Sequence, residues 1–260
     1  MSKWDRVGWV WEKLAQDNAY GAILTKGGQV AEWNLTEFLA TGRQDIDRFL
    51  PHLNALAPAA PRQRALDFGC GVGRVTRPLS EYFDQVVGVD ASPSMIARAR
   101  TLHADLDRCR FVLNQAPHLG QFADGSFDVV YSRIVLQHLR PWLARRYIGE
   151  LVRVLAPGGM LMFQLPEIMS LDPRDAFELA PVEGLAFKRL VPKPAVIWWR
   201  RVKYGLVTRG THLVEMKMFG LPRDEVLGLV HAAGGRLLET RPDYSHGEDD
   251  VRGFEYWVTR

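Results

Sequence analysis

The sequence predicts an α/β fold, in which a mostly parallel sheet carries helices on both of its faces. From Arg64 onward, short apolar runs alternate with helical stretches, an order typical of strands that pair in parallel. One apolar run opens into Gly69, Gly71 and Gly73, and the next run ends at Asp90, about 20 residues after the first glycine, which is the length of one βαβ step. Glycine suits such a turn because it accepts positive φ and lets a ligand approach the backbone closely. The pattern therefore predicts a nucleoside-binding turn.

The other elements are predicted from apolar runs and helix-start signals. Strands are expected at 64–69, 85–90, 109–114, 127–133 and 159–165, helices near 73–83, 93–104 and 141–155, then a helix at 222–233 and closing strands at 235–240 and 254–259. Ser92 and Pro93 are suited to begin the second helix, with serine as its cap and proline in its first turn. Pro141 can open the third helix in the same way.

Four segments divide the chain. Residues 1–61 are predicted to be a helical, partly aromatic extension that ends in an Ala/Pro-rich linker, and residues 62–166 to be the core. The alternation of strands and helices stops in 167–221, which is therefore predicted to be an insert. Residues 222–260 return to the core with the last helix and a strand hairpin.

Composition excludes several classes of protein. The chain has 260 residues, of which 47% are hydrophobic and 24% charged, as in ordinary globular proteins. Its two cysteines provide no disulfide framework, so a reducing, cytoplasmic location is expected. The N-terminal residues lack the apolar stretch of a signal peptide, and no apolar run approaches the ~20 residues of a membrane span. A net charge of +3 does not by itself indicate binding to nucleic acid.

The glycine turn resembles motif I of the class I S-adenosylmethionine-dependent methyltransferases. Its glycines alternate, with Asp67 directly before them and Arg74 directly after, whereas nicotinamide and flavin sites show Gly-x-Gly-x-x-Gly. Three later stretches resemble the same family in the same order: 124–132, 136–139, and 151–159 with its Pro-Gly-Gly turn. The resemblance covers about residues 62 to 166. It implies a Rossmann-like seven-stranded sheet with an antiparallel last strand, a substrate cap in 167–221, and S-adenosylmethionine as cofactor, with S-adenosylhomocysteine as product.

The resemblance also implies which residues hold this cofactor. Asp67, Gly69 and Gly71 would surround its methionyl part, Asp90 would accept the ribose hydroxyls, and Ala91 and Met95 would touch the adenine. After the third strand, the amide of Asn114 or Gln115 could accept from the adenine amino group, and Ala116 could supply a backbone N–H. The remaining candidates complete the turn or end the fourth strand, and they are Cys70, Gly73, Arg74, Ser132 and Arg133. Arg133 could face the cofactor carboxylate or a substrate anion, or be a solvated charge.

His138 is the candidate catalytic residue. Methyl transfer depends on holding the nucleophile, methyl group and sulfur in line, and a hydroxyl acceptor must also lose its proton. Histidine titrates in the useful range, although the resemblance slightly favours a structural role for His138 in orienting its loop. His118, His212 and His246 are weaker candidates. No metal site is predicted, because the acidic cluster at 245–250 falls where the last two strands are joined and is expected to be a solvated loop.

A basic segment extends from Leu185 to Val214, with seven Lys or Arg residues, no acidic residue, and Trp198 and Trp199 among them. It could bind a phosphate-bearing or lipid-linked substrate, or contact an anionic membrane surface weakly. The favoured interpretation is an amphipathic helix whose tryptophans pack on the core while its arginines are solvated.

These features predict a methyltransferase for a small or medium-sized acceptor, possibly anionic. An oxygen acceptor on a sugar, a lipid-linked glycan or a secondary metabolite is favoured, because the fourth strand ends in Ser132-Arg133-Ile134-Val135 and not in the Asn/Asp-Pro-Pro-Tyr/Phe of enzymes that methylate amino groups of nucleobases. The alternatives are an RNA methyltransferase and a cofactor-binding protein without turnover. The sequence predicts neither the acceptor nor the oligomeric state.

Overall fold

The structure, a computed structural model, describes residues 5–26, 29–30, 32–167, 218–243 and 253–260. The basic segment at 185–214, almost all of the predicted insert, His212, His246 and the acidic cluster at 245–250 lie outside these residues. In the described part of the chain, no helix is long and apolar enough to cross a bilayer.

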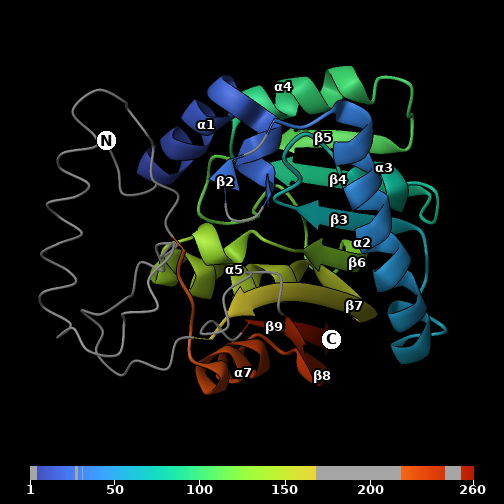
Figure 1. The fold of residues 1–260 in the computed structure, drawn as a ribbon. Coiled ribbons are helices and arrows are strands. Elements are labelled where there is room, and N and C mark those ends of the chain that lie inside the picture. The colour runs from blue at the N-terminus through green and yellow to red at the C-terminus, as the bar shows by residue number, and fades with distance from the viewer. Residues whose placement is uncertain (1–4, 27–28, 31, 168–217, 244–252) are drawn as a thin grey trace, which may run out of the picture.

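Within these residues, seven strands form one sheet in the order β5-β4-β3-β6-β7-β9-β8 (Figure 1). Its strands are β3 (Arg64–Phe68), β4 (Gln85–Asp90), β5 (Cys109–Leu113), β6 (Phe127–Ser132), β7 (Leu155–Pro166), β8 (Arg236–Asp243) and β9 (Gly253–Thr259). The first five pair in parallel, and β9 inserts antiparallel to both β7 and β8. The predicted α/β fold with an antiparallel last strand is therefore confirmed.

The helices agree with the predicted positions except in one case. They are α1 (Asp5–Ile23), α2 (Leu35–Leu56), α3 (Thr76–Leu79), α4 (Pro93–Leu102), α5 (Pro141–Val154) and α7 (Arg223–Ala232). The N-terminal extension also contains a short hairpin of β1 (Thr25–Lys26) and β2 (Gln29–Val30), which the sequence pattern did not show.

The prediction of a helix over 73–83 was wrong in length, because α3 has only four residues. At its start, Gly73 has φ +85°, outside the helical region. At its end, the Ser80 hydroxyl donates to the Arg77 carbonyl at 2.7 Å, a local bond that competes with continuation of the helix.

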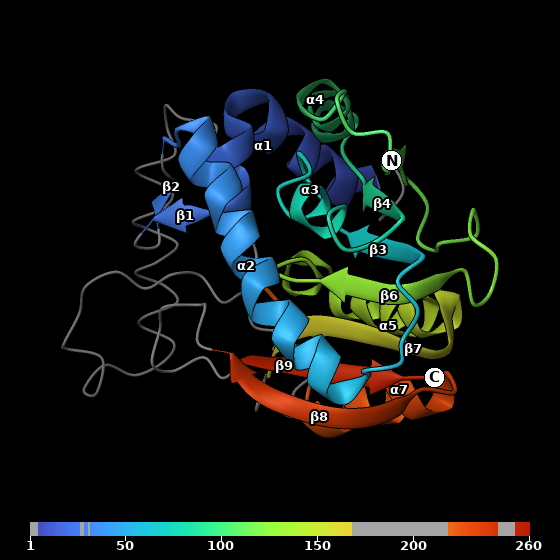
Figure 2. The ribbon, with the colours of Figure 1, turned by 90° about the vertical axis from the view of Figure 1, so that its right-hand side faces the viewer.

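Alternate residues of each central strand point to opposite layers of helices. On one face, Ala65, Val86 and Val129 are buried against the α2 side chains Ile46 and Phe49. On the other face, Leu66, Val87 and Val130 belong to a core formed with α5 and α7. Figure 2 shows α2 crossing one side of the sheet, with α5 and α7 on the other. Burial on both faces explains why these strands are nearly continuous apolar runs in the sequence.

Helix α2 packs directly onto the backbone of the glycine turn. Gly42 lies in this helix, and a Cβ added there would overlap the Arg74 carbonyl oxygen. One helical turn later, Asp45 pairs with the Arg74 guanidinium at 2.7 Å. Helix α2, which belongs to the N-terminal extension, therefore supports the nucleoside-binding turn.

We expect Gly42→Ala to destabilise the fold by ~1–3 kcal/mol, because the added methyl group must push α2 away from the turn. Alanine otherwise favours a helix by up to ~1 kcal/mol over glycine. Gly149→Ala in α5 is the matched control, since no described atom lies within 4 Å of a Cβ at that position. The control should be neutral or stabilising in thermal and urea unfolding. Equal effects of the two substitutions would contradict the close packing of α2.

Candidate functional site

A pocket with about 1030 Å³ of empty space opens at the carboxyl ends of β3, β4 and β6. In an open parallel sheet this edge is where ligands bind. Among the sequence-predicted residues, the pocket is lined by Asp67, Gly69, Cys70, Gly71, Arg74, Asp90, Ala91, Met95, Asn114, Arg133 and His138. The structure thus brings together residues from five separate stretches of the chain.

The glycine turn passes so close to its neighbours that side chains are excluded. Gly69, Gly71 and Gly73 have φ of +80°, +53° and +85°, values that favour glycine. A Cβ on Gly71 would also lie 2.6 Å from the Cδ1 atom of Ile23 in α1, and one on Gly69 would overlap Val135. The side chains of Ile23 and Val135 thus pack directly against the backbone of the turn, which only glycine permits.

Asp90 connects this turn to the end of β4. Its Oδ2 accepts from the Gly71 amide and its Oδ1 from the Ser92 amide, both at 2.9 Å. Burial raises the pKa of Asp90, and the two amide donors oppose that rise. Each oxygen of a carboxylate offers more than one acceptor site, so Asp90 can still accept hydroxyl groups from a ligand in the pocket.

Asp67, at the end of β3, is a buried acid directly under the glycine turn. It accepts from the Thr76 hydroxyl at 2.6 Å. Burial raises the pKa of Asp67 to about 6, against the opposing effects of the Thr76 bond and the Arg74 charge. The nearby Cys70 is buried too, and burial raises the pKa of its thiol, which fits a small apolar filler.

Helix α1 forms a wall of the pocket that the sequence did not predict. Trp11, Ala22 and Ile23 line it. The helix is held by Glu12, which accepts from the Ser92 hydroxyl at 2.6 Å and the Ser94 amide at 3.0 Å. Although burial acts to raise it, these hydrogen bonds keep the pKa of Glu12 below its ordinary value. Glu12 thus completes the N-terminal cap of α4 from another helix.

Four predicted residues do not line the pocket. They are Gly73, Gln115, Ala116 and Ser132. Gly73 instead packs against the rings of His103 and Phe111, and Ser132 is buried in the sheet. The Ala116 carbonyl accepts from Tyr147, a pocket residue on α5 that the sequence analysis missed. Nothing in the sequence distinguishes Tyr147 from other apolar-face residues of its helix.

The arginines of the site are neutralised by acids from distant elements. Asp45 pairs with Arg74 at 2.7 Å and with Arg133 at 2.6 Å, while Asp243 and Glu255 lie 3.5 and 4.0 Å from the Arg133 guanidinium. Arg48 also lies 3.9 Å from Asp45, so three cations face three acids in this cluster. Arg133 is therefore not a solvated charge, and since it lines the pocket, its contact with a ligand anion stays a prediction.

His138 lies at the pocket wall at the end of a short 3-10 helix, Leu136–His138. Its ring meets the edge of Trp11 with centroids 5.0 Å apart, and its Nε2 lies 3.3 Å from the Gln137 Nε2. His118, by contrast, does not line the pocket, and its Nδ1 accepts from the Gly120 amide. His138 is the candidate that faces the space beside the cofactor residues. Among the described residues, no cluster of His, Cys, Asp or Glu could hold a metal ion.

Comparison with known proteins identifies the domain that contains this site. Residues 66–163 match the family described as "Methyltransferase domain". The chain is 37% identical over 118 residues to trans-aconitate 2-methyltransferase of Deinococcus radiodurans, covering 44% of the chain and 42% of the relative. It is 34% identical over 113 residues to malonyl-[acyl-carrier protein] O-methyltransferase of Pectobacterium atrosepticum, covering 43% and 42%. The chain thus spans less than half the length of these relatives.

The fold has counterparts among solved structures. Magnesium protoporphyrin IX methyltransferase from Synechocystis PCC 6803, solved with bound S-adenosylhomocysteine, superposes with a TM-score of 0.60 at 18% identity, covering 98% of this chain and 99% of that one. The pocket residues fit such a ligand, because the Asp90 carboxylate retains acceptor capacity for hydroxyl groups.

Asp90→Ala should weaken binding of S-adenosylmethionine by more than tenfold, or ~1.4 kcal/mol, since it removes the acceptor for the ribose and releases the Gly71 amide. Asp84→Ala, at the opposite and exposed end of the strand, is the control and should bind normally. Titration calorimetry measures both. Unchanged affinity in Asp90→Ala would remove Asp90 from the site.

The raised pKa of Asp67 predicts that cofactor affinity falls below about pH 6, by up to ~tenfold per pH unit, because protonation removes the negative charge facing the cationic methionyl end. The effect of pH on the stability of the unliganded fold should have the opposite sign. Its Asp67 titrates near 6 and the unfolded chain near 3.8, so this group favours folding at low pH and that contribution is lost as the pH rises through 6. Calorimetric titration with S-adenosylmethionine from pH 5 to 8 measures the predicted change in cofactor affinity. Asp67→Asn should flatten it, and a pH-independent wild type would contradict the assignment.

Proposed function

We propose that the chain, whose residues 66–163 match a methyltransferase domain, is a class I S-adenosylmethionine-dependent methyltransferase that methylates an oxygen of a small or medium-sized acceptor. The observation that carries the proposal is the position of His138, a titratable imidazole on the wall of the pocket that holds Asp67 and Asp90. An oxygen nucleophile requires such a group, because its proton must be removed during transfer.

Different residues of this chain would contact different parts of the cofactor. The glycine turn and Asp67 hold the methionyl end, Asp90 holds the ribose, and Met95 and Asn114 lie at the adenine end. When bound, S-adenosylmethionine supplies a methyl group on a sulfonium, whose positive charge is lost as the methyl group leaves in line with the attacking atom.

His138 is proposed to accept the proton of the acceptor hydroxyl. The edge of Trp11 and the amide of Gln137 contact its ring, and these contacts limit the orientations of the imidazole. Trp11 comes from α1, so the wall near His138 also excludes water from one side of the pocket. Exclusion of water strengthens the electrostatic interactions inside a site.

The charge of the site favours an acceptor that is itself uncharged. Arg133 lies where a substrate anion could reach the pocket, but Asp45, Asp243 and Glu255 already surround it. A hydroxyl of a sugar, a lipid-linked glycan or a secondary metabolite suits this arrangement better than a carboxylate or phosphate. The two relatives named above act on trans-aconitate and on malonyl-[acyl-carrier protein], so acceptors differ among similar proteins.

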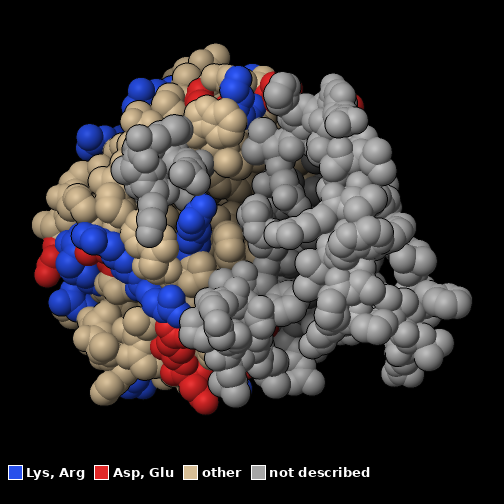
Figure 3. All heavy atoms as spheres, turned by 90° about the vertical axis from the view of Figure 1, so that its left-hand side faces the viewer, with Lys and Arg blue, Asp and Glu red and all other residues tan. Residues whose placement is uncertain are grey.

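RNA is the second acceptor class to test. On the face of the molecule drawn in Figure 3, basic and acidic side chains of the described residues lie next to one another, without a continuous basic surface. A basic surface would be needed to follow a phosphate backbone, and binding would then fall steeply with salt. This mixed charge favours the small acceptor.

The proposal is tested by incubating the protein with methyl-¹³C-labelled S-adenosylmethionine and either a small-molecule extract or an RNA fraction. We expect label in the small-molecule fraction, in a product whose carbon NMR signal is that of a methoxy group. His138→Ala should lower kcat by roughly a hundredfold at neutral pH with nearly unchanged cofactor affinity. His118→Ala, outside the pocket, should turn over normally.

Other outcomes would contradict parts of the proposal. Label on nitrogen or carbon would refute the oxygen acceptor, and label only in RNA would establish the alternative substrate. Cofactor binding without any transfer would indicate a non-catalytic role. Full turnover in His138→Ala would leave that residue with a structural function.

A further inference from the structure

The turn that follows β6 contains a residue in a backbone conformation that its side chain disfavours. Ile134 has φ +59°, and it is the one residue other than glycine with a positive φ in the part of the chain that the structure describes. A β-branched residue is an outlier in this left-handed region, because its Cβ crowds the backbone. Such strain persists only where the surroundings enforce it, and it is commonest at functional sites. Ile134 lines the pocket.

The side chain of Gln164 in β7 enforces this conformation. Its Oε1 accepts from the Ile134 amide at 3.1 Å. Gln164 is fully buried, although the neighbouring residues of its strand are apolar. Rotation of Ile134 out of the left-handed region would take this donor away from a buried oxygen, which is costly. The bond therefore favours the strained turn over a relaxed one.

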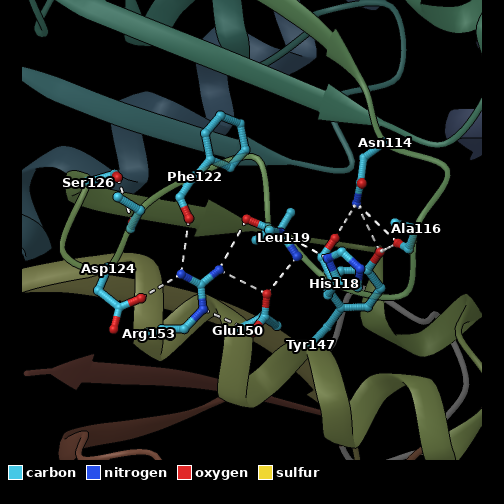
Figure 4. Close-up of polar contacts among 12 residues, drawn as sticks. Asn114, Ala116, His118, Leu119, Phe122, Asp124, Ser126, Tyr147, Glu150 and Arg153 are labelled. Carbon is cyan, nitrogen blue, oxygen red and sulfur yellow. Dashed lines mark hydrogen bonds and ion pairs between the residues drawn. The ribbon is translucent and has the colours of Figure 1, made fainter.

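A neighbouring loop is held in a different way. The loop after β5 is bonded by two side chains of α5, because Glu150 accepts from the Leu119 amide at 2.6 Å and Arg153 donates to the Leu119 carbonyl at 3.1 Å (Figure 4). Within the described residues, by contrast, Gln164 is the one side chain that bonds the backbone of residues 133–135. The turn after β6 thus depends on a single side chain.

The left-handed turn directs the residues that follow it back onto the site. Val135 packs so closely against the glycine turn that a Cβ on Gly69 would overlap its side chain. The Val135 carbonyl accepts from the His138 amide at 2.9 Å, within the short 3-10 helix that carries this histidine. Both residues line the pocket. A relaxed turn would therefore move Val135 away from Gly69 and His138 away from the pocket together.

We propose that Gln164 is a positioning residue, which holds the strained turn at Ile134 so that Val135 packs against the glycine turn and His138 faces the pocket. Gln164 does not itself line the pocket, so it acts through the Ile134 amide. The part that concerns His138 rests on the proposed function. The effect on ligand affinity does not depend on which residue accepts the proton.

Calorimetric titration of Gln164→Leu with S-adenosylhomocysteine tests this role. The affinity should fall at least ~tenfold, because ligand binding must then return a relaxed turn to the binding conformation. Gln164→Glu, measured at about pH 6, is the rescue variant, since burial keeps its carboxyl protonated and its carbonyl oxygen can accept from the Ile134 amide. Its affinity should stay within about threefold of the wild type at the same pH. Met162→Leu, a volume-conserving change on the same face of β7, should bind normally.

A second pair of variants tests the strain itself. Glycine adopts the left-handed region without penalty, so in an Ile134→Gly background the turn should no longer depend on Gln164. Adding Gln164→Leu to this background should lower the affinity by less than about threefold, against at least ~tenfold in the wild-type background. The NMR signals of the His138 ring, assigned with His138→Ala, should shift in Gln164→Leu and return toward their wild-type positions in Gln164→Glu.

Three results would overturn the inference. They are unchanged affinity in Gln164→Leu, the same loss of affinity in both backgrounds, or an equal loss in Met162→Leu. If Gln164→Leu does not fold, relief of the strain by Ile134→Gly should restore folding, and failure to do so would also contradict the inference. Full turnover in His138→Ala would refute the proposed base and leave these affinities as they are. Failure of the wild type to bind S-adenosylhomocysteine would instead refute the cofactor assignment.

Discussion

The carboxylate of Asp90 is the interaction on which the site depends. It accepts from the Gly71 amide with one oxygen and from the Ser92 amide with the other, so it connects the glycine turn, the end of β4 and the start of α4. Without it, two buried amides would lose their acceptor, which is costly in a site shielded from water. The same carboxylate faces the pocket. Its structural role and the ligand-binding role that we propose for it therefore cannot be separated by moving it.

The N-terminal extension is a structural part of this site. Glu12 of α1 accepts a hydrogen bond from Ser92 at the start of α4, and Trp11 and Ile23 of the same helix line the pocket. Asp45 of α2 pairs with the arginines at the ends of the glycine turn and of β6. These contacts place acids beside both arginines. A segment outside residues 66–163, which match the methyltransferase domain, thus shapes the pocket.

The parts of this protein that were predictable are those encoded in local sequence. The glycine turn, Asp90 and the Ser92-Pro93 helix start each depend on residues close in the chain, and the structure places the turn and Asp90 together at the pocket. The contacts that were missed join residues far apart. Glu12 meets Ser92 across 80 positions, and Asp45 meets Arg133 across 88. No periodicity or motif in the sequence indicates such pairs, because only the folded sheet brings their residues together.

The surroundings of some residues could not be predicted for the same reason. The three acidic neighbours of Arg133 come from α2, β8 and β9. Gly42 would ordinarily count as a weak point in a helix, yet it is the residue that lets α2 approach the glycine turn. The length of α3 was overestimated, since the positive φ of Gly73 is a property of the folded turn.

A crystal structure of the protein with S-adenosylhomocysteine tests the central claim most directly. The account predicts the ribose hydroxyls within hydrogen-bond distance of the Asp90 carboxylate, the homocysteine end at the glycine turn and Asp67, and the adenine amino group at Oδ1 of Asn114. A ligand bound elsewhere, or one whose ribose does not contact Asp90, would contradict it.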